Sequence, residues 1–142
     1  MTDRGVYLLL VSVRRRRKVA CGRLGRVNFA AGLYAYAGSA RRGLASRLAR
    51  HHRREKRLHW HIDYLLAAVG SGQVSSLAFP APGLAECRLA QQVRASATGF
   101  VPRFGSSDCR CPSHLFYLGP APQWRSTEKL PTRGVARRLK SS

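Results

Sequence analysis

Residues 6–13 read VYLLLVSV, and residues 32–38 read GLYAYAG. The first segment is a short, nearly unbroken apolar run with β-branched residues, which is typical of a buried strand. In the second, Tyr34 and Tyr36 are two residues apart, so an extended chain places both side chains on one face. We therefore expect two strands here, with the two tyrosines on the same side of a sheet.

Beyond these strands, the spacing of apolar residues changes to that of helices. Leu44 and Leu48 are four apart and basic residues continue the same register, which predicts a helix over about 43–54. We expect two further helices, one from near His59 to Val69 and one over about 84–95. The other expected elements are an irregular strand or hairpin over 19–29, short strands over 74–79 and 113–118, and a loop over 100–112.

The chain carries 26 Lys and Arg against 6 Asp and Glu, a formal net charge of +20. Such an excess repels itself in the folded state, which points to a polyanionic partner: nucleic acid first, an anionic membrane surface second. The sequence offers neither a long apolar span nor an amphipathic anchor, so we expect no membrane partner. No protein partner can be inferred. We expect a cytoplasmic protein with reduced cysteines.

A length of 142 residues with 44% hydrophobic residues suits one domain with its own core. From about Pro120 the signals for ordered structure fade, and Trp124–Ser142 is basic with few apolar residues. We therefore expect a folded domain over 1–119 and a flexible basic tail over 120–142.

Two tripeptides, a basic helix and a later glutamate follow one another along the chain. They are Gly5-Val6-Tyr7, Tyr36-Ala37-Gly38, Arg47 with His51, and Glu86. This order resembles the core of the GIY-YIG nuclease family over about residues 5–95. Segments 29–40, 47–52, 59–64 and 105–116 resemble its Uri-type endonuclease branch, formerly a domain of unknown function, which extends the likeness to about residues 1–118.

The resemblance implies an α+β fold, with a small, mainly antiparallel central sheet flanked by three helices. It also implies metal-dependent endonuclease activity, with Glu86 holding a single divalent metal beside the scissile phosphate. Mg²⁺ is the first candidate and Mn²⁺ the second. The sequence departs from the family pattern through an insertion around 13–29 and one extra residue before Arg47, which Gly43 would absorb. Val6 and Ala37 occupy the middle positions of the tripeptides, where strand packing decides the residue.

The chemistry of these side chains agrees with phosphodiester hydrolysis. Tyr7 is a candidate general base if a nearby cation lowers its pKa from about 10. Arg47 can hold phosphate oxygens with its planar fork, and His51, one turn further, can relay a proton or bind phosphate. Tyr36 belongs to the same catalytic set. A carboxylate such as Glu86, pointing inward in so basic a chain, needs a partner, and Mg²⁺ with retained waters would suit it.

Each of these residues also has a structural reading. The two tyrosines could be half-buried strand residues, and Arg47 a plain phosphate contact. His51 could be a surface charge beside His52, and Glu86 could pair with Arg88 or Arg94. The combination, rather than any one residue, favours an active site.

Two further groups are candidates for binding. The predicted nucleic-acid-binding residues are Arg41, Arg42, Arg50, His52, Arg54, His59 and His61. The pair His59 and His61 could also bind metal, although substrate contact or packing is favoured because few other ligands are evident. Cys109, Cys111 and His114, completed by Cys87 or Cys21, could form a structural zinc site. The other reading is that Ser106, Ser107 and Asp108 shape a loop that closes on the active-site face.

The sequence thus favours an endonuclease that cleaves DNA by metal-assisted hydrolysis, in repair or in restriction of foreign DNA. The alternative is a non-catalytic nucleic-acid-binding module whose basic face grips phosphates. A ribosome-associated RNA-binding protein would fit the charge but would not explain the set of tyrosine, arginine and glutamate.

Overall fold

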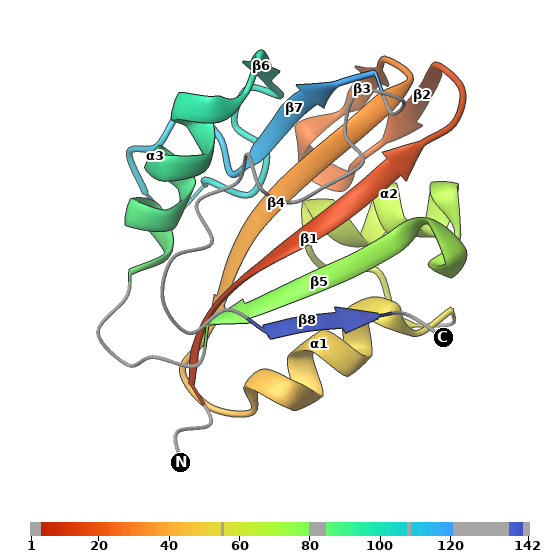
Figure 1. The fold of residues 1–142 in the computed structure, drawn as a ribbon. Coiled ribbons are helices and arrows are strands. Elements are labelled where there is room, and N and C mark those ends of the chain that lie inside the picture. Colours follow the sequence, from red (N-terminus) through yellow and green to blue (C-terminus); the bar gives the residue numbers. More distant parts are fainter. Residues whose placement is uncertain (1–3, 55, 80–84, 108, 121–136, 141–142) are drawn as a thin grey trace.

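The structure is a computed structural model that describes residues 4–54, 56–79, 85–107, 109–120 and 137–140. Within these residues six strands form one antiparallel sheet in the order β6-β7-β4-β1-β5-β8 (Figure 1). These strands are β1 (Gly5–Val13), β4 (Gly32–Ala40), β5 (Val74–Phe79), β6 (Gly99–Phe100), β7 (Leu115–Gly119) and β8 (Arg137–Lys140). The helices are α1 (Leu44–His52), α2 (His61–Val69) and α3 (Glu86–Ser96), with short 3-10 turns η1 (Gly22–Leu24) and η2 (Ser71–Gln73). The predicted α+β fold class is confirmed.

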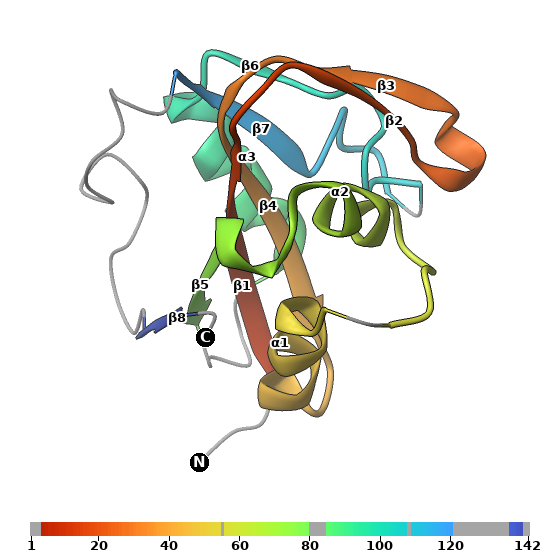
Figure 2. The same ribbon diagram turned by 90° about the vertical axis from the view of Figure 1, so that its right-hand side faces the viewer.

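Helices cover both faces of the sheet, α1 and α2 on one side and α3 on the other (Figures 1 and 2). Tyr7, Leu9 and Val11 of β1 join the core with α1 and α2, whereas the alternate residues Val6 and Leu8 join the core with α3. Burial on both faces explains why β1 reads as an unbroken apolar run rather than an alternating one. Each large apolar side chain buried in these two cores contributes about 1.5–3 kcal/mol.

The insertion after β1 forms a small sheet of its own. Strands β2 (Arg17–Ala20) and β3 (Arg26–Phe29) pair as an antiparallel hairpin, one of the two alternatives expected for this segment. The hairpin is tied to α2, because the Arg17 guanidinium donates a hydrogen bond of 2.5 Å to the carbonyl of Ala68. Phe29 is fully buried against Phe104. The extra residues therefore extend the α2 face without interrupting the pairing of β1 with β4.

Three details differ from the sequence expectations or add to them. The expected loop over 100–112 begins with β6, a two-residue strand that pairs with β7. Gly43 adopts a left-handed conformation (φ 67°) at the start of α1, where the extra residue was expected to be absorbed. Of the tail expected to be flexible, Arg137–Lys140 forms β8 along β5, while 121–136 and 141–142 lie outside the described residues.

Within the described part of the chain, no helix has the length and apolar character needed to span a bilayer.

The glycine of the second tripeptide makes room for the tyrosine of the first. Tyr7 and Gly38 are directly opposite each other on β1 and β4. A Cβ atom on Gly38 would lie 2.5 Å from the Tyr7 hydroxyl oxygen and closer still to its ring. The two tripeptides are therefore neighbours across the sheet, and the tyrosine lies over a position that only glycine can occupy without displacement.

Gly38→Ala is expected to destabilise the protein by about 1–3 kcal/mol, because the added methyl group overpacks a buried site. Urea unfolding measures the loss. Gly99→Ala in β6 is the matched control, since a Cβ there would meet no atom within 4 Å. Equal unfolding midpoints for Gly38→Ala and the wild type would contradict the packing of Tyr7 on Gly38.

Candidate active site

A pocket of about 420 Å³ lies at the edge of β4. Strand β7 pairs with β4 only over Leu33–Tyr36. The backbone N–H of the next residue, Ala37, donates a hydrogen bond of 2.9 Å to the carbonyl of His114, in the loop before β7. Beyond this point β4 runs on past its partner. Six of the side chains singled out in the sequence line the pocket: Tyr7, Tyr36, Arg47, His59, His61 and Glu86.

Ser39 at the end of β4 joins the two faces of the sheet. Its hydroxyl donates a hydrogen bond of 2.5 Å to Oε1 of Glu86, the first residue of α3. Its carbonyl accepts a hydrogen bond of 2.5 Å from the Arg47 guanidinium, which belongs to α1. Although α1 and α3 cover opposite faces, Arg47 and Glu86 thus meet around the edge of β4 that no described strand covers. Sequence reasoning missed Ser39, whose only signal is its position directly after the second tripeptide.

Glu86 is held as an ionised carboxylate. Its Oε2 atom lies 2.6 Å from Nδ1 of His114, and its side chain remains 29% exposed. Burial alone would raise the pKa of Glu86, but the close contact with His114 and the hydrogen bond from Ser39 outweigh this effect, so the pKa is lowered. The partners of Glu86 in the described structure are therefore His114 and Ser39. They are not Arg88 or Arg94, the residues considered as alternative partners.

The nearby carboxylate of Asp63 is not available to a ligand. Asp63 is fully buried and accepts two hydrogen bonds from Arg50, at 2.9 and 3.0 Å. It also accepts hydrogen bonds from the backbone N–H groups of His59 and Trp60 at the start of α2. Glu86 is therefore the carboxylate that this pocket presents to a cation.

Tyr7 and His51 form a buried neutral pair. The Tyr7 hydroxyl lies 2.7 Å from Nε2 of His51. Burial, followed by the charge of Lys56, lowers the pKa of His51 to about 3, so its imidazole is neutral at physiological pH. His51 is 2% exposed and lies behind Tyr7 rather than on the pocket wall, so it is not the surface charge considered as an alternative.

The expectation that a cation lowers the pKa of Tyr7 is corrected by its burial. Burial and the neighbouring Tyr36 raise the pKa of Tyr7, and the opposing effect of Arg47 is smaller. Burial also raises the pKa of Tyr36. Both phenols are therefore protonated in the protein alone, and Tyr7 can donate its proton in a hydrogen bond to His51.

The indole of Trp60 orients the basic side chains of α1. The guanidinium carbons of Arg47 and Arg50 lie 4.9 and 4.5 Å from the centre of the Trp60 ring. Such cation–π contacts fix a guanidinium without neutralising it. Trp60 lines the pocket beside Arg47, a role that the sequence did not distinguish from packing.

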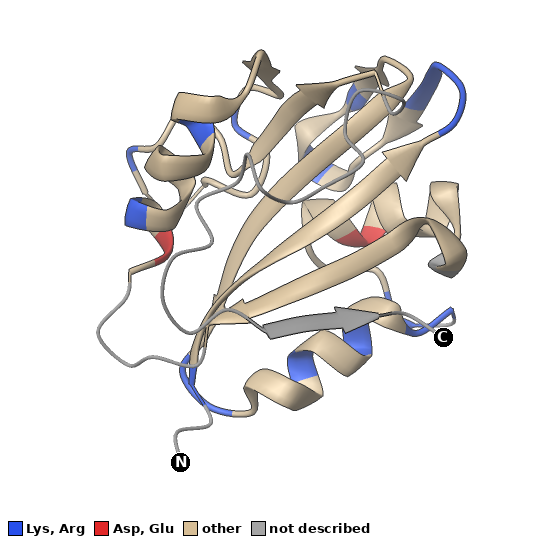
Figure 3. Ribbon diagram, viewed as in Figure 1, with Lys and Arg blue, Asp and Glu red and all other residues tan. Residues whose placement is uncertain are grey.

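The seven candidate nucleic-acid-binding residues divide by accessibility. Arg41, Arg42 and Arg54 are exposed around α1, and His59 and His61 line the pocket. Figure 3 shows Lys and Arg along α1, on α3 and in the turn after β1. Arg50 and His52 also have partners within the fold. Arg50 is bound to Asp63 and to the carbonyl of Arg57, and Nε2 of the half-buried His52 lies 2.9 Å from the Ser76 hydroxyl.

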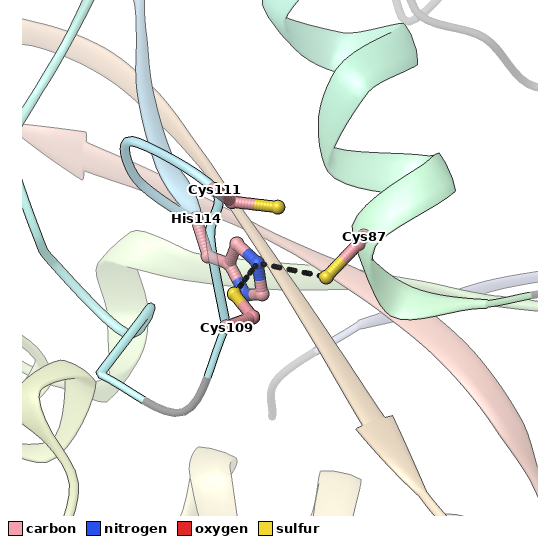
Figure 4. A group of neighbouring side chains, drawn as sticks. All are labelled: Cys87, Cys109, Cys111 and His114. Carbon is pink, nitrogen blue, oxygen red and sulfur yellow. Dashed lines mark hydrogen bonds between the residues drawn. The ribbon is translucent and has the colours of Figure 1, made fainter.

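A separate cluster of potential metal ligands lies next to Glu86. Cys87 follows Glu86 in α3, and the loop before β7 supplies Cys109, Cys111 and His114 (Figure 4). The ligand atoms of these four residues lie within 4.8 Å of one another. Of the two cysteines considered as a further ligand, Cys87 belongs to the cluster, whereas Cys21 is buried in the segment that follows β2. His59 and His61 are not part of it: Nδ1 of His61 accepts a hydrogen bond from the Gly105 amide.

The loop before β7 contributes residues both to the pocket and to the cysteine and histidine cluster. Gly105 and Ser107 line the pocket, while Cys109 and Cys111 face α3. Asp108 lies outside the described residues.

The family described as "Domain of unknown function DUF123" matches residues 6–133 of the chain. Neither the curated proteins nor the solved structures include a match to this sequence.

The lowered pKa of His51 predicts a specific pH dependence of stability. Below about pH 6.5 the unfolded chain binds a proton at His51, whereas the folded chain does not until about pH 3. The contribution of His51 to folding is therefore complete above about pH 6.5 and decreases as the pH falls. By pH 5 the loss is on the order of 2 kcal/mol.

His51→Gln keeps a hydrogen-bond acceptor for Tyr7 but removes the titration. Between pH 7.5 and pH 5, urea unfolding should show a smaller loss of stability for this variant than for the wild type, by about 2 kcal/mol. Parallel pH dependences of the two proteins would show that His51 is not a buried neutral histidine.

Proposed function

The chain belongs to the DUF123 family. We propose that it is a metal-dependent endonuclease of the GIY-YIG type that hydrolyses DNA phosphodiester bonds. The observation that carries the proposal is the convergence of Tyr7, Arg47 and Glu86 on one pocket from three separate elements. The likeness of the two tripeptides, the arginine and the glutamate to the GIY-YIG and Uri-type nucleases supports the same activity.

Arg47 is suited to stabilise the charge that develops on a phosphate during hydrolysis. One nitrogen of its guanidinium donates to the Ser39 carbonyl, and the ring of Trp60 supports the group from the side. A guanidinium has five N–H donors, so others remain for phosphate oxygens. Because these contacts fix the group before substrate binds, little reorganisation is required in the transition state.

The Tyr7 and His51 pair can position a water molecule and move its proton. When Tyr7 donates to Nε2 of His51, the lone pairs of its hydroxyl oxygen can accept a hydrogen bond from water in the pocket. A proton passing from water to Tyr7 as the Tyr7 proton passes to His51 avoids a buried tyrosinate. The neutral state of His51 leaves Nε2 open to this proton, and because the pKa of His51 is about 3 the buried imidazolium so formed is a short-lived species that must return the proton at once.

Glu86 fits a hard divalent cation. It is ionised, partly exposed and the one carboxylate of the described pocket lining, and a single carboxylate suits Mg²⁺, which retains most of its waters. Mn²⁺ fits the same donor. A cation held by Glu86 would supply charge stabilisation to the scissile phosphate and its leaving oxygen.

The distribution of charge supports a nucleic-acid substrate. Exposed Arg41, Arg42 and Arg54 extend the basic surface of α1 beyond the pocket, in a chain with a formal net charge of +20. Such residues bind phosphates without regard to sequence and make the affinity depend on salt.

Nicking of supercoiled plasmid with and without Mg²⁺ tests the proposal. Glu86→Gln keeps the size and hydrogen-bonding capacity of the side chain but removes the charge, so nicking should fall about a hundredfold or more, because a lost metal contact costs several kcal/mol. DNA binding by this variant should be equal to that of the wild type or slightly stronger.

Arg47→Ala should weaken both nicking and DNA binding, and the nicking rate should fall more than the affinity for DNA.

Arg88→Ala is the matched control for Arg47→Ala, because Arg88 is exposed on α3 and does not line the pocket. It should nick DNA at close to the wild-type rate. A wild-type protein that binds DNA but never cuts it with Mg²⁺ would instead be a binding module. Unchanged nicking by Glu86→Gln would reject the role of the glutamate.

A further inference from the structure

The cluster of three cysteines and one histidine beside the pocket has the composition and geometry of a metal site. Nε2 of His114 lies 3.5 Å from Sγ of Cys109 and 3.8 Å from Sγ of Cys87. Neighbouring ligands of a tetrahedral zinc ion with Zn–S bonds of about 2.3 Å are about 3.8 Å apart. Figure 4 shows the sulfur of Cys111 directed into the space between the loop and α3, towards the other ligands.

The kind of ligand selects the metal. Three thiols and one imidazole are soft to intermediate donors that favour Zn²⁺ over Mg²⁺. Four protein ligands fill a tetrahedral shell and leave no position for substrate, which is the pattern of structural rather than catalytic zinc. A bound zinc ion favours the thiolate form of its cysteine ligands.

The same histidine connects this cluster to the pocket. His114 is 1% exposed, with Nε2 towards the sulfurs and Nδ1 2.6 Å from Oε2 of Glu86. A metal on Nε2 leaves the ring proton on Nδ1, where it can be donated to the carboxylate. Metal-bound histidines commonly have such a carboxylate partner, which fixes the ring orientation.

We propose that Cys87, Cys109, Cys111 and Nε2 of His114 bind one structural Zn²⁺, and that this ion positions Glu86 through His114. Such an anchor would hold the start of α3, where Ala85 at the N-cap makes no side-chain capping hydrogen bond. The zinc ion would hold Cys87, and His114 and Ser39 would hold the adjacent Glu86, so that the first turn of α3 is fixed from two sides. Glu86 then has two roles: one of its carboxylate oxygens contacts His114, a zinc ligand, and its side chain also lines the pocket.

Zinc binding does not depend on the proposed nuclease activity, whereas the positioning of Glu86 does. Metal analysis of the full-length protein, purified without chelators, should find about one zinc per chain. Co²⁺ exchanged into the protein should give the intense absorption of thiolate-to-cobalt charge transfer. Cys109→Ser and Cys111→Ser should lose both signals, while Cys21→Ala, which alters a cysteine outside the cluster, should keep them.

His114→Cys separates zinc binding from positioning. It offers a fourth thiolate, so the variant should retain zinc and its thermal stability, but it removes the Nδ1 donor to Glu86. Mn²⁺ binding at the pocket, followed by electron paramagnetic resonance with the zinc site filled, should then weaken about tenfold or more.

Three results would overturn parts of this proposal. A wild-type protein that neither contains zinc nor takes up Zn²⁺ or Co²⁺ rejects the metal site, as would a disulfide between the cluster cysteines in protein prepared under reducing conditions. A zinc-loaded His114→Cys protein with wild-type Mn²⁺ affinity rejects the positioning role alone. A wild-type protein that holds zinc but never cleaves DNA rejects the proposed function and leaves the zinc site intact.

Discussion

The length of β4 relative to β7 is the constraint on which the pocket depends. The two strands pair over Leu33–Tyr36, and β4 then continues to Ala40 beside a loop rather than along a strand. A fully paired β4 would separate the two faces of the sheet. Because no strand of the described residues pairs with this edge of β4 at Ser39, one residue can bind Arg47 from α1 through its carbonyl and Glu86 from α3 through its hydroxyl. Two layers with separate hydrophobic cores thus contribute to one site.

The electrostatics of the site follow from the same arrangement. Tyr7 and His51 lie deep in the core beneath α1, so burial keeps both neutral. Glu86 lies at the edge, where two hydrogen bonds and partial exposure keep it ionised. A neutral tyrosine backed by His51 and an anionic carboxylate in the same pocket suit the metal-assisted hydrolysis proposed above. Asp63, two residues after His61 in the sequence, is buried and paired with Arg50 and therefore stays structural.

The sequence predicted the fold class because the period of apolar residues changes clearly between strands and helices. The candidate site residues could be selected from their order along the sequence, but their burial and hydrogen-bond partners could not be predicted. Burial of Tyr7 depends on Gly38, opposite in the sheet, and on His51, and a pKa cannot be inferred without knowing these contacts. The roles of Arg50 and Ser39 were missed for a similar reason: the first is decided by a buried partner in α2, the second by where β7 stops. Cys87 could not be distinguished from Cys21 as a ligand until α3 was placed against the loop before β7.

In the proposed site, phosphate and metal meet at the edge of β4, beyond its pairing with β7. A crystal structure of the protein with a short DNA duplex and Mn²⁺, read by anomalous scattering, would show whether they do. We expect a manganese peak within coordination distance of the Glu86 carboxylate and a backbone phosphate against Arg47. Manganese bound away from Glu86, or a duplex that leaves the pocket open to solvent, would contradict it.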